Sequence, residues 1–154
     1  MESTTVPGDE KLELISFEIA GQGFCIDIRS VREIRGWTPV TPMPHTPAYV
    51  LGVINLRGAV MAVMDLRRRL GLGDTEASSR HVFVVVEHGA RTAGLLVDAV
   101  RETFVVEASQ MQPPPVADAF EGEALVDGVL ALEGRMLSRL VVGALLPGGN
   151  RLAA

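Results

Sequence analysis

Apolar and polar residues alternate over several short stretches of the chain, which is the pattern of strands with one buried face. The first stretch is residues 15–19 (ISFEI), and the second is residues 24–29 (FCIDIR). The sequence Gly21-Gln22-Gly23 between them suits a tight turn, because glycine adopts positive backbone angles without steric cost. These two stretches are therefore predicted to form a β-hairpin.

The remaining apolar runs are equally short and are separated by turn residues. Further strands are predicted over residues 59–65, 81–87, 92–97, 100–106, 125–132 and 136–142. One or two helical turns are predicted over residues 66–72, and four prolines between residues 39 and 47 exclude a regular helix or a central strand there. About ten short strands with little helix are typical of barrels and sandwiches.

A turn of sequence Asn-Leu-Arg-Gly, residues 55–58, lies between two aliphatic strands. Gly58 accommodates a positive backbone angle, and Asn55 is common in turns. The charged side chain of Arg57 is expected to be presented to solvent rather than buried. A rigid sheet surface with a fixed arginine suits the binding of a protein partner better than the transformation of a substrate.

Composition narrows the functional classes. The 154 residues are 47% hydrophobic and 21% charged, which is sufficient for a packed interior. The formal net charge of −5 argues against a nucleic-acid binder, since such proteins usually carry a basic surplus. The single cysteine, Cys25, excludes an internal disulfide. Because the sequence has neither a secretory signal nor an apolar run of about 20 residues, we expect a cytoplasmic protein without direct membrane insertion.

A polar segment at residues 74–79 is the best candidate for an internal boundary. The expected organisation is a flexible N-terminal tail, one domain that contains two barrels, and a C-terminal tail. The approximate bounds of the tails and barrels are 1–11, 12–73, 80–146 and 147–154, with the domain spanning 12–146. An exchange of strands between the barrels at the termini is left open.

The histidines and the cysteine show no spacing that would build a metal or cofactor site. His45, His81 and His88 are spread over a proline-rich loop, a strand start and a hairpin turn, without the short spacing of zinc ligands. Cys25 lies among apolar strand residues without a recognisable base partner, so a buried and inert thiol is predicted. We expect no cofactor and no metal.

An enzyme with a small barrel fold is the alternative from a different functional class. Asp65 and Asp98 each end a predicted strand and could be imagined as paired catalytic carboxylates. Strand-terminal aspartates usually accept hydrogen bonds from turn amides instead. A deep pocket lined by perturbed titratable groups would revive the enzyme hypothesis.

Six segments of the chain form an ordered set of motifs. They read FCIDIRSVREIR, TPAYV, GVINLRG, MDLR, GLLVD and LEGR, and they begin at residues 24, 46, 52, 64, 94 and 132. This set resembles the CheW coupling proteins of bacterial chemotaxis, and the resemblance covers residues 12–146. A lone Asn-Leu-Arg-Gly turn would be a weak signal, whereas the ordered set is specific.

The resemblance implies an all-β fold of two small SH3-like five-stranded β-barrels packed side by side, with short helical turns. The implied function is that of a chemotaxis adaptor, a scaffold without enzymatic activity. It would link the cytoplasmic tip of a methyl-accepting chemoreceptor to the regulatory domain of the CheA histidine kinase. The isolated protein is expected to be a monomer, to bind no nucleic acid and to be recruited from the cytoplasm to membrane-associated receptor arrays.

Receptor- and kinase-binding positions of the family carry over to eight residues of this sequence. They are Val31, Glu33, Ile34, Gly52, Arg57, Val82, Gly94 and Val100. Each position has a simpler interpretation. The aliphatic residues can be core, the glycines can be turn or bulge residues, and the two charges can be solvated or can form a weak ion pair with each other. The resemblance favours Arg57 most, because it lies beside a tight turn.

Residues near the C-terminus depart from the family pattern. Ser138 and Arg139 interrupt a strand that is usually aliphatic, and Val141 and Gly143 replace residues that are usually acidic. Because burying an unpaired Arg139 would be costly, we expect it to face solvent, a partner or a carboxylate. These departures keep an alternative function open. It is a CheW-like paralogue of a non-motility chemosensory pathway, or an array component that does not activate the kinase.

Overall fold

The computed structural model describes residues 10–114 and 125–147. Over these residues the chain forms ten strands: β1 (Lys11–Ile19), β2 (Gln22–Asp27), β3 (Val31–Gly36), β4 (Val50–Leu56), β5 (Ala59–Asp65), β6 (Val82–His88), β7 (Arg91–Val97), β8 (Ala99–Glu107), β9 (Val126–Leu132) and β10 (Arg135–Leu140). The short helices are α1 (Leu66–Arg69), α2 (Val142–Leu145), and the 3-10 turns η1 (Ile28–Ser30) and η2 (Ala108–Gln110). The predicted all-β class with short helical turns is confirmed.

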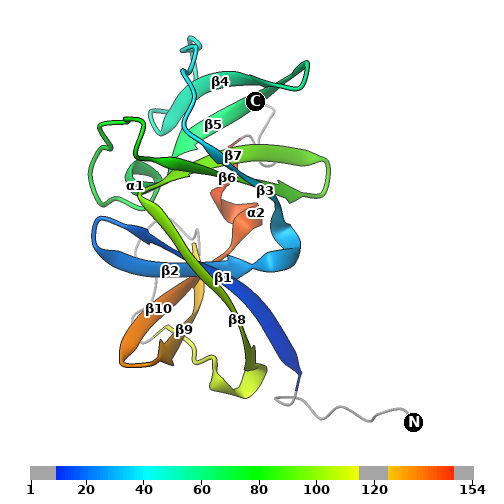
Figure 1. Cartoon of the computed structure of the whole chain (residues 1–154), viewed down its shortest axis with the longest axis vertical. Coiled ribbons are helices and arrows are strands. Elements are labelled where there is room, and N and C mark those ends of the chain that lie inside the picture. Colours follow the sequence, from blue (N-terminus) through cyan, green and yellow to red (C-terminus); the bar gives the residue numbers. More distant parts are fainter. Residues whose placement is uncertain (1–9, 115–124, 148–154) are drawn as a thin grey trace.

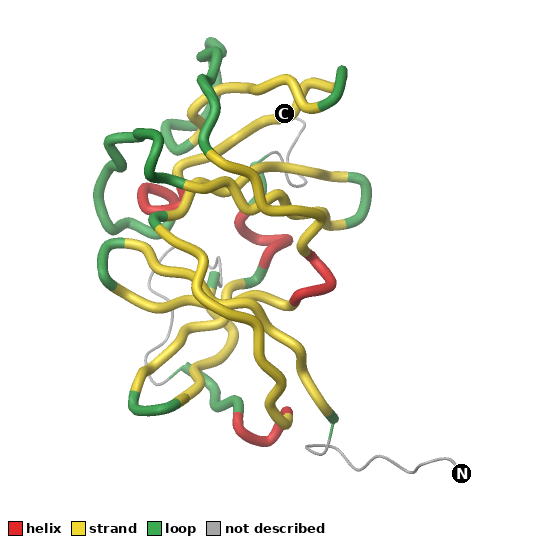
Figure 2. The backbone as a smooth tube through the Cα atoms, in the orientation of Figure 1, coloured by secondary structure: helices red, strands yellow, loops and turns green. Residues whose placement is uncertain are grey.

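The strands form two five-stranded sheets, which are the two small barrels of the fold. Barrel A has the strand order β8-β1-β2-β10-β9, and barrel B has the order β3-β6-β7-β5-β4. In Figure 1 barrel B lies above barrel A along the long axis of the molecule. Figure 2 shows the helical segments, with α2 lying between the two barrels.

The two barrels share one architectural plan. In each barrel an antiparallel hairpin (β1–β2 or β6–β7) pairs in parallel with the last strand of a second hairpin (β9–β10 or β4–β5). Gly23 is opposite Leu137 in barrel A, and Gly94 is opposite Val63 in barrel B. Each second hairpin is followed directly by a short helix, α2 or α1. The structure therefore contains an internal pseudo-symmetry that no exact sequence repeat reveals.

Three hydrophobic clusters hold the fold together. The cluster inside barrel A consists of Leu14, Cys25, Val106, Leu130 and Leu137. The cluster inside barrel B consists of Ile54, Met61, Val63, Phe83, Val85 and Leu96. The largest cluster lies between the barrels and contains sixteen buried residues, which come from both sheets, from α1 and α2, and from Leu146 after α2. Burial of this shared apolar surface is the main force that holds the barrels against each other.

Strand β1 departs from the alternation that its sequence predicts. Because it lies between the interior of barrel A and the shared core, both of its faces are covered. Ser16 is only 1% exposed, and its hydroxyl donates a hydrogen bond to the Glu102 carbonyl at 3.3 Å. The prediction of a half-buried strand is therefore wrong at Ser16, and the hydrogen bond compensates for the burial of the hydroxyl group.

The predicted division into barrels at residues 12–73 and 80–146 does not match the strand pairing. Barrel B is formed by the consecutive strands β3 to β7, whereas barrel A combines β1 and β2 with β8, β9 and β10. The polar segment 74–79 connects α1 to β6 and so lies within barrel B. Local composition identifies a loop but does not specify which strands pair across it. The predicted tails lie mostly outside the described residues.

Candidate protein-interaction site

Arg57 lies at the tip of the β4–β5 hairpin, where its φ angle of 52° is in the left-handed region. The next residue, Gly58, donates its N–H to the side-chain oxygen of Asn55 at 2.9 Å, which closes the turn. The Arg57 side chain is 65% exposed. The turn sequence therefore presents a guanidinium group at the surface, as its pattern predicts.

The Arg57 guanidinium forms an ion pair with Glu33 of β3. Its Nη2 donates to Glu33 Oε2, and its Nη1 lies 3.5 Å from Oε1. Strands β3 and β4 are the two outer strands of the barrel B sheet, so this pair links its open edges. The hydrogen bond from Arg57 lowers the pKa of Glu33, and the same bond raises the pKa of Arg57.

The surface beside this pair is hollowed, with a volume of about 350 Å³. Its lining includes the two paired charges and the side chain of Val60, which is 72% exposed. Sequence reasoning missed Val60. The alternation within β5 could have identified it, because Met61 and Val63 are buried and Val60 must therefore point outward. The hollow combines apolar and charged groups, as protein-binding surfaces commonly do.

The three predicted valines lie along the edge of the core between the barrels. We call this edge the seam. Val31, Val82 and Val100 are half-buried and pack against that core. Val31 is opposite Val86 and Val82 is opposite Gly36, so these two valines lie at opposite ends of the β3–β6 ladder. Val100 comes from barrel A. The seam valines are neither fully buried nor freely exposed, and each leaves part of its surface open to solvent.

The two predicted glycines have clear structural roles. Gly52 follows a bulge in β4 and has a φ angle of 147°, and a β-carbon there would collide with the carbonyl oxygen of Thr41. A β-carbon on Gly94 would lie 2.9 Å from Cγ1 of Val63 in the neighbouring strand β5. Both glycines are buried. They permit close approach of two backbones or two strands, and they present no side chain to a partner.

The eight predicted residues therefore do not form one cluster. The Glu33–Arg57 pair lies beside the barrel B hollow, the three valines lie along the seam, and the glycines act inside the fold. Ile34, on the outer face of β3, is 41% exposed. Sequence reasoning placed these residues on one surface because their separation in space depends on the strand order.

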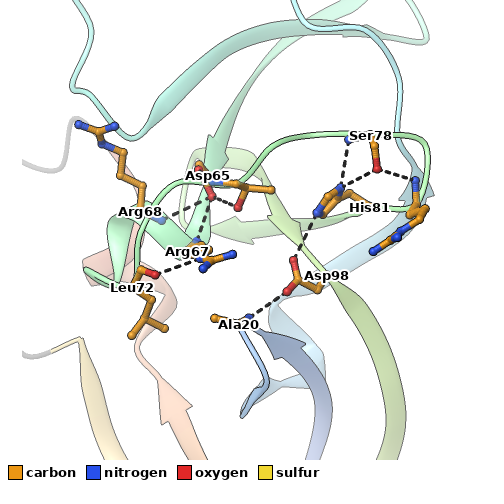
Figure 3. A network of polar contacts seen from close by, with 10 residues as sticks. Ala20, Asp65, Arg67, Arg68, Leu72, Ser78, His81 and Asp98 are labelled. Atoms are coloured by element: carbon orange, nitrogen blue, oxygen red, sulfur yellow. Dashed lines mark hydrogen bonds and ion pairs between the residues drawn. The ribbon is translucent and has the colours of Figure 1, made fainter.

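The two strand-ending aspartates are occupied by turn groups, as predicted. Asp65 accepts hydrogen bonds from the N–H of Arg67 at 3.1 Å and from the hydroxyl of Thr75 at 2.6 Å. Asp98 accepts a hydrogen bond from the N–H of Ala20 at 2.9 Å. Figure 3 shows that the two carboxylates point toward different loops. They do not converge as a catalytic pair would.

Cys25 is fully buried in barrel A, as predicted for an inert thiol. Burial raises the pKa of its thiol to about 12, although the nearby Arg139 guanidinium acts in the opposite direction. Among the described residues, no group of three or more His, Cys, Asp or Glu side chains is placed to hold a metal ion. Within the same residues, no helix is long and apolar enough to cross a membrane.

Comparison with known proteins identifies the relatives of this chain. The model of the CheW-like domain matches residues 13–148. The chain is 50% identical over 143 residues to the chemotaxis protein CheW of Rhizobium meliloti (strain 1021), covering 92% of both sequences. It is 32% identical over 134 residues to CheW of Klebsiella aerogenes, covering 87% of this chain and 81% of that one. The crystal structure of the scaffolding protein TtCheW from Thermoanaerobacter tengcongensis superposes with a TM-score of 0.79 at 28% identity, covering 93% of this chain and 94% of the other.

The chain belongs to the CheW family. The resemblance that its motifs carry is thereby confirmed, and so is the predicted function of a chemotaxis adaptor. CheW proteins are scaffolds that couple chemoreceptors to the CheA kinase, and they are not enzymes. The functional questions for this adaptor are therefore which of its surfaces contact each partner and how the two barrels hold those surfaces in place.

The departures near the C-terminus are accommodated within the fold of this adaptor. Arg139 forms a two-point ion pair with Asp127 of β9, at 2.8 Å and 3.1 Å. Of the three environments expected for Arg139, which were solvent, a partner and a carboxylate, the structure shows the carboxylate. Gly143 lies in α2 beside the His88 ring, where a β-carbon would approach Nε2 to 2.7 Å. Arg139 is therefore paired within barrel A, and the lack of a side chain at Gly143 leaves room for the His88 ring.

Proposed function

We propose that this adaptor binds the cytoplasmic tip of a methyl-accepting chemoreceptor and the regulatory domain of a CheA-type histidine kinase. It would be recruited in this way to membrane-associated receptor arrays, and it would be a monomer when isolated. The observation that carries the proposal is the exposed Arg57, fixed on a tight hairpin and paired with Glu33 beside the barrel B hollow. Family membership supplies the class of partner.

The surfaces suit a helical partner. A receptor tip is expected to be an antiparallel helical hairpin, and an amphipathic helix binds through apolar residues at helical spacing with charges that fix its register. The seam valines offer half-buried apolar contacts, and the Glu33–Arg57 pair offers charges of both signs. Val31 and Val82 are about four strand residues apart, which is roughly 13 Å and comparable to two to three helical turns.

Substitution of Arg57 tests this proposal. Arg57→Ala should weaken capture of a soluble receptor-tip fragment or of the kinase regulatory domain by about tenfold, because interface arginines often dominate binding. Its melting temperature should change little, because the side chain is exposed. Titration calorimetry with each purified partner, together with thermal denaturation, measures both effects.

Arg29 provides a matched control. It is also an exposed arginine, paired with Asp27 at 2.8 Å, but it lies in η1 and does not line the barrel B hollow. Arg29→Ala should leave both affinities unchanged. A reversed charge in Glu33→Lys should reduce receptor-tip binding as well. Unchanged affinity for both partners in Arg57→Ala and Glu33→Lys would contradict the proposed site.

A further inference from the structure

The chain crosses from barrel B to barrel A at Asp98, between β7 and β8. Three hydrogen-bonding groups meet at this residue. Its backbone N–H donates to the Glu18 carbonyl at 3.0 Å, and its Oδ2 accepts the Ala20 N–H at 2.9 Å. Its Oδ1 lies 3.3 Å from Nε2 of His81. Asp98 therefore joins the β1–β2 hairpin of barrel A to the residue that immediately precedes β6 of barrel B (Figure 3).

His81 is itself held in a defined orientation. The Ser78 N–H donates to its Nδ1 at 3.1 Å, and the His81 N–H donates to the Ser78 carbonyl at 3.0 Å. Because Nδ1 accepts a hydrogen bond, the ring proton of a neutral imidazole resides on Nε2, the nitrogen that faces Asp98 Oδ1. The side chain is only 12% exposed. The pair is thus a close polar contact between two groups, each of which is held in place by other hydrogen bonds.

The residues Ser78, His81 and Asp98 have the composition of a catalytic triad but not its geometry. A nucleophilic serine must donate its hydroxyl proton to a free imidazole nitrogen. Here Ser78 Oγ lies 3.4 Å from Nδ1, but the Ser78 backbone N–H donates to the same nitrogen at 3.1 Å, and the Ser78 hydroxyl accepts the N–H of Arg80 at 3.3 Å. Nδ1 is therefore already occupied by a backbone donor, and Nε2 faces Asp98. The arrangement is built to hold a loop and a strand in place.

The pair lies directly beside two seam valines. Val82 follows His81 in the chain, and Val100 is two residues after Asp98. Val82 belongs to barrel B and Val100 to barrel A, so the contact between His81 and Asp98 spans the seam beside them. The apolar core between the barrels is non-directional. Polar contacts between fixed groups add direction: His81 and Asp98 do so beside these two valines, whereas Arg69 and Arg91 donate hydrogen bonds to carbonyls of α2.

We propose that the His81–Asp98 pair is a positioning element that sets Val82 of barrel B relative to Val100 of barrel A for binding of the receptor tip. This inference rests on the proposed function. Asp98 holds barrel A through Glu18 and Ala20, and His81 holds barrel B through Ser78. The pair acts through the valines and need not contact the partner itself.

The test uses three variants of the full chain. His81→Phe keeps an aromatic ring but removes the donor, whereas His81→Gln places an amide N–H at about the reach of Nε2. His45→Phe, at an exposed histidine in the proline-rich segment, is the matched control. Residual dipolar couplings of the backbone amides report the orientation of barrel A relative to barrel B. Titration with a soluble receptor-tip fragment reports affinity.

In His81→Phe we expect the couplings of each barrel to fit its own structure, but with a changed orientation between barrels. Affinity for the receptor tip should fall about tenfold, because removing one polar partner from a partly buried contact costs about that much in the arrangement that it stabilises. His81→Gln should restore the orientation and most of the affinity, a recovery that a loss of general packing would not allow. His45→Phe should match the wild type.

The outcomes separate this inference from the proposed function. An unchanged orientation in His81→Phe, or a changed orientation with unchanged affinity, overturns the positioning role while receptor binding stands. A His81→Gln variant that binds as poorly as His81→Phe also overturns it. Failure of the wild-type protein to bind the receptor tip overturns the proposed function, and the positioning role falls with it.

Discussion

The Arg57 side chain is exposed to solvent and also forms an ion pair. Its guanidinium is held by Glu33, and its backbone is held in a left-handed turn. A partner that offers a carboxylate must therefore compete with Glu33 for the guanidinium, whereas a partner that offers a donor can bind Glu33 in place. In both cases the side chain is already ordered before binding. This order reduces the conformational entropy that association costs.

The Glu33–Arg57 pair makes a testable prediction about acid titration. The pKa of Glu33 is lowered in the folded protein, so the pair stabilises the fold above the ordinary glutamate pKa of about 4.3. That contribution is lost as the pH falls through the lower, folded-state pKa. A ¹³C NMR titration of the Glu33 carboxyl should give a midpoint below the ordinary value. In Arg57→Ala the midpoint should rise toward it.

Arg29→Ala is the control for this titration, because it removes a similar ion pair, with Asp27, that does not involve Glu33. It should leave the Glu33 midpoint unchanged. Identical midpoints in the wild type and in Arg57→Ala would show that the pair does not persist in solution.

At the residue scale, local properties were predictable from sequence and long-range partners were not. The exposure of Arg57 follows from its turn, and the burial of Cys25 follows from its apolar neighbours. In the short helix predicted over residues 66–72, Arg69 donates to the carbonyls of Ala144 and Leu145 in α2. Nothing in the local sequence indicates a contact with residues 75 and 76 positions away.

Among the elements, β4 shows how closely a glycine can be tied to the fold. Thr41 exchanges two backbone hydrogen bonds with Val53, each 2.9 Å long, and this pairing presses the proline-rich segment onto Gly52. Gly52 combines a positive φ with contact against the Thr41 carbonyl. The close approach of the proline-rich segment is therefore the reason that a glycine is needed at position 52.

Gly52→Ala should destabilise the protein by roughly 2 kcal/mol or more, because a methyl group there overlaps backbone atoms that cannot easily move. Gly36→Ala is the matched control, since a β-carbon at Gly36 meets no atom within 4 Å among the described residues. Chemical denaturation measures both. Equal stability of Gly52→Ala and the wild type would disprove the close approach, and loss of binding in this variant would reflect loss of fold.

The strands that alternate between clear turns were predictable, and the others were not. Residues 59–65 coincide with β5, and the prediction for residues 125–132 differs from β9 by one residue. Strand β3 was not predicted, because its sequence, VREIRG, carries three charges and only two aliphatic residues. The strand predicted over residues 136–142 ends at Leu140, and the chain then turns into α2. Val142 and Leu145 are drawn into the core between the barrels, a tertiary contact that overrides the strand pattern.

For the whole molecule, the strand count was predictable but the path of the chain was not. The two barrels were expected to be successive halves, because sequence neighbours usually pair in space, and an exchange of terminal strands was left open. The structure instead encloses barrel B, as consecutive strands, between the two parts of barrel A. The predicted site residues fall into separate groups for the same reason. The seam contains residues from both barrels, and which residues meet there depends on the path of the chain.

The chain path predicts how fragments behave. A fragment of residues 1–73 lacks β6 and β7, and a fragment of residues 80–154 lacks the strands that complete either barrel. Neither should give a dispersed amide NMR spectrum, because an incomplete sheet buries too little apolar surface. Residues 28–98 contain all five strands of barrel B and serve as the control. They should retain the circular dichroism of β-sheet, and a folded 1–73 fragment would contradict this pairing.

The enclosed arrangement also has a consequence during synthesis on the ribosome. Barrel B can close as soon as residue 97 has emerged, whereas the N-terminal hairpin must wait until β10 is made, more than 110 residues after it. Until then β1 can pair with β8 and pack against barrel B, but the edge of β2 that pairs with β10 stays open, so the nascent chain exposes it to chaperones and proteases. A messenger truncated near its 3′ end would therefore yield a product with one finished barrel and one open barrel. Cells could discard such a product before it reached a receptor array.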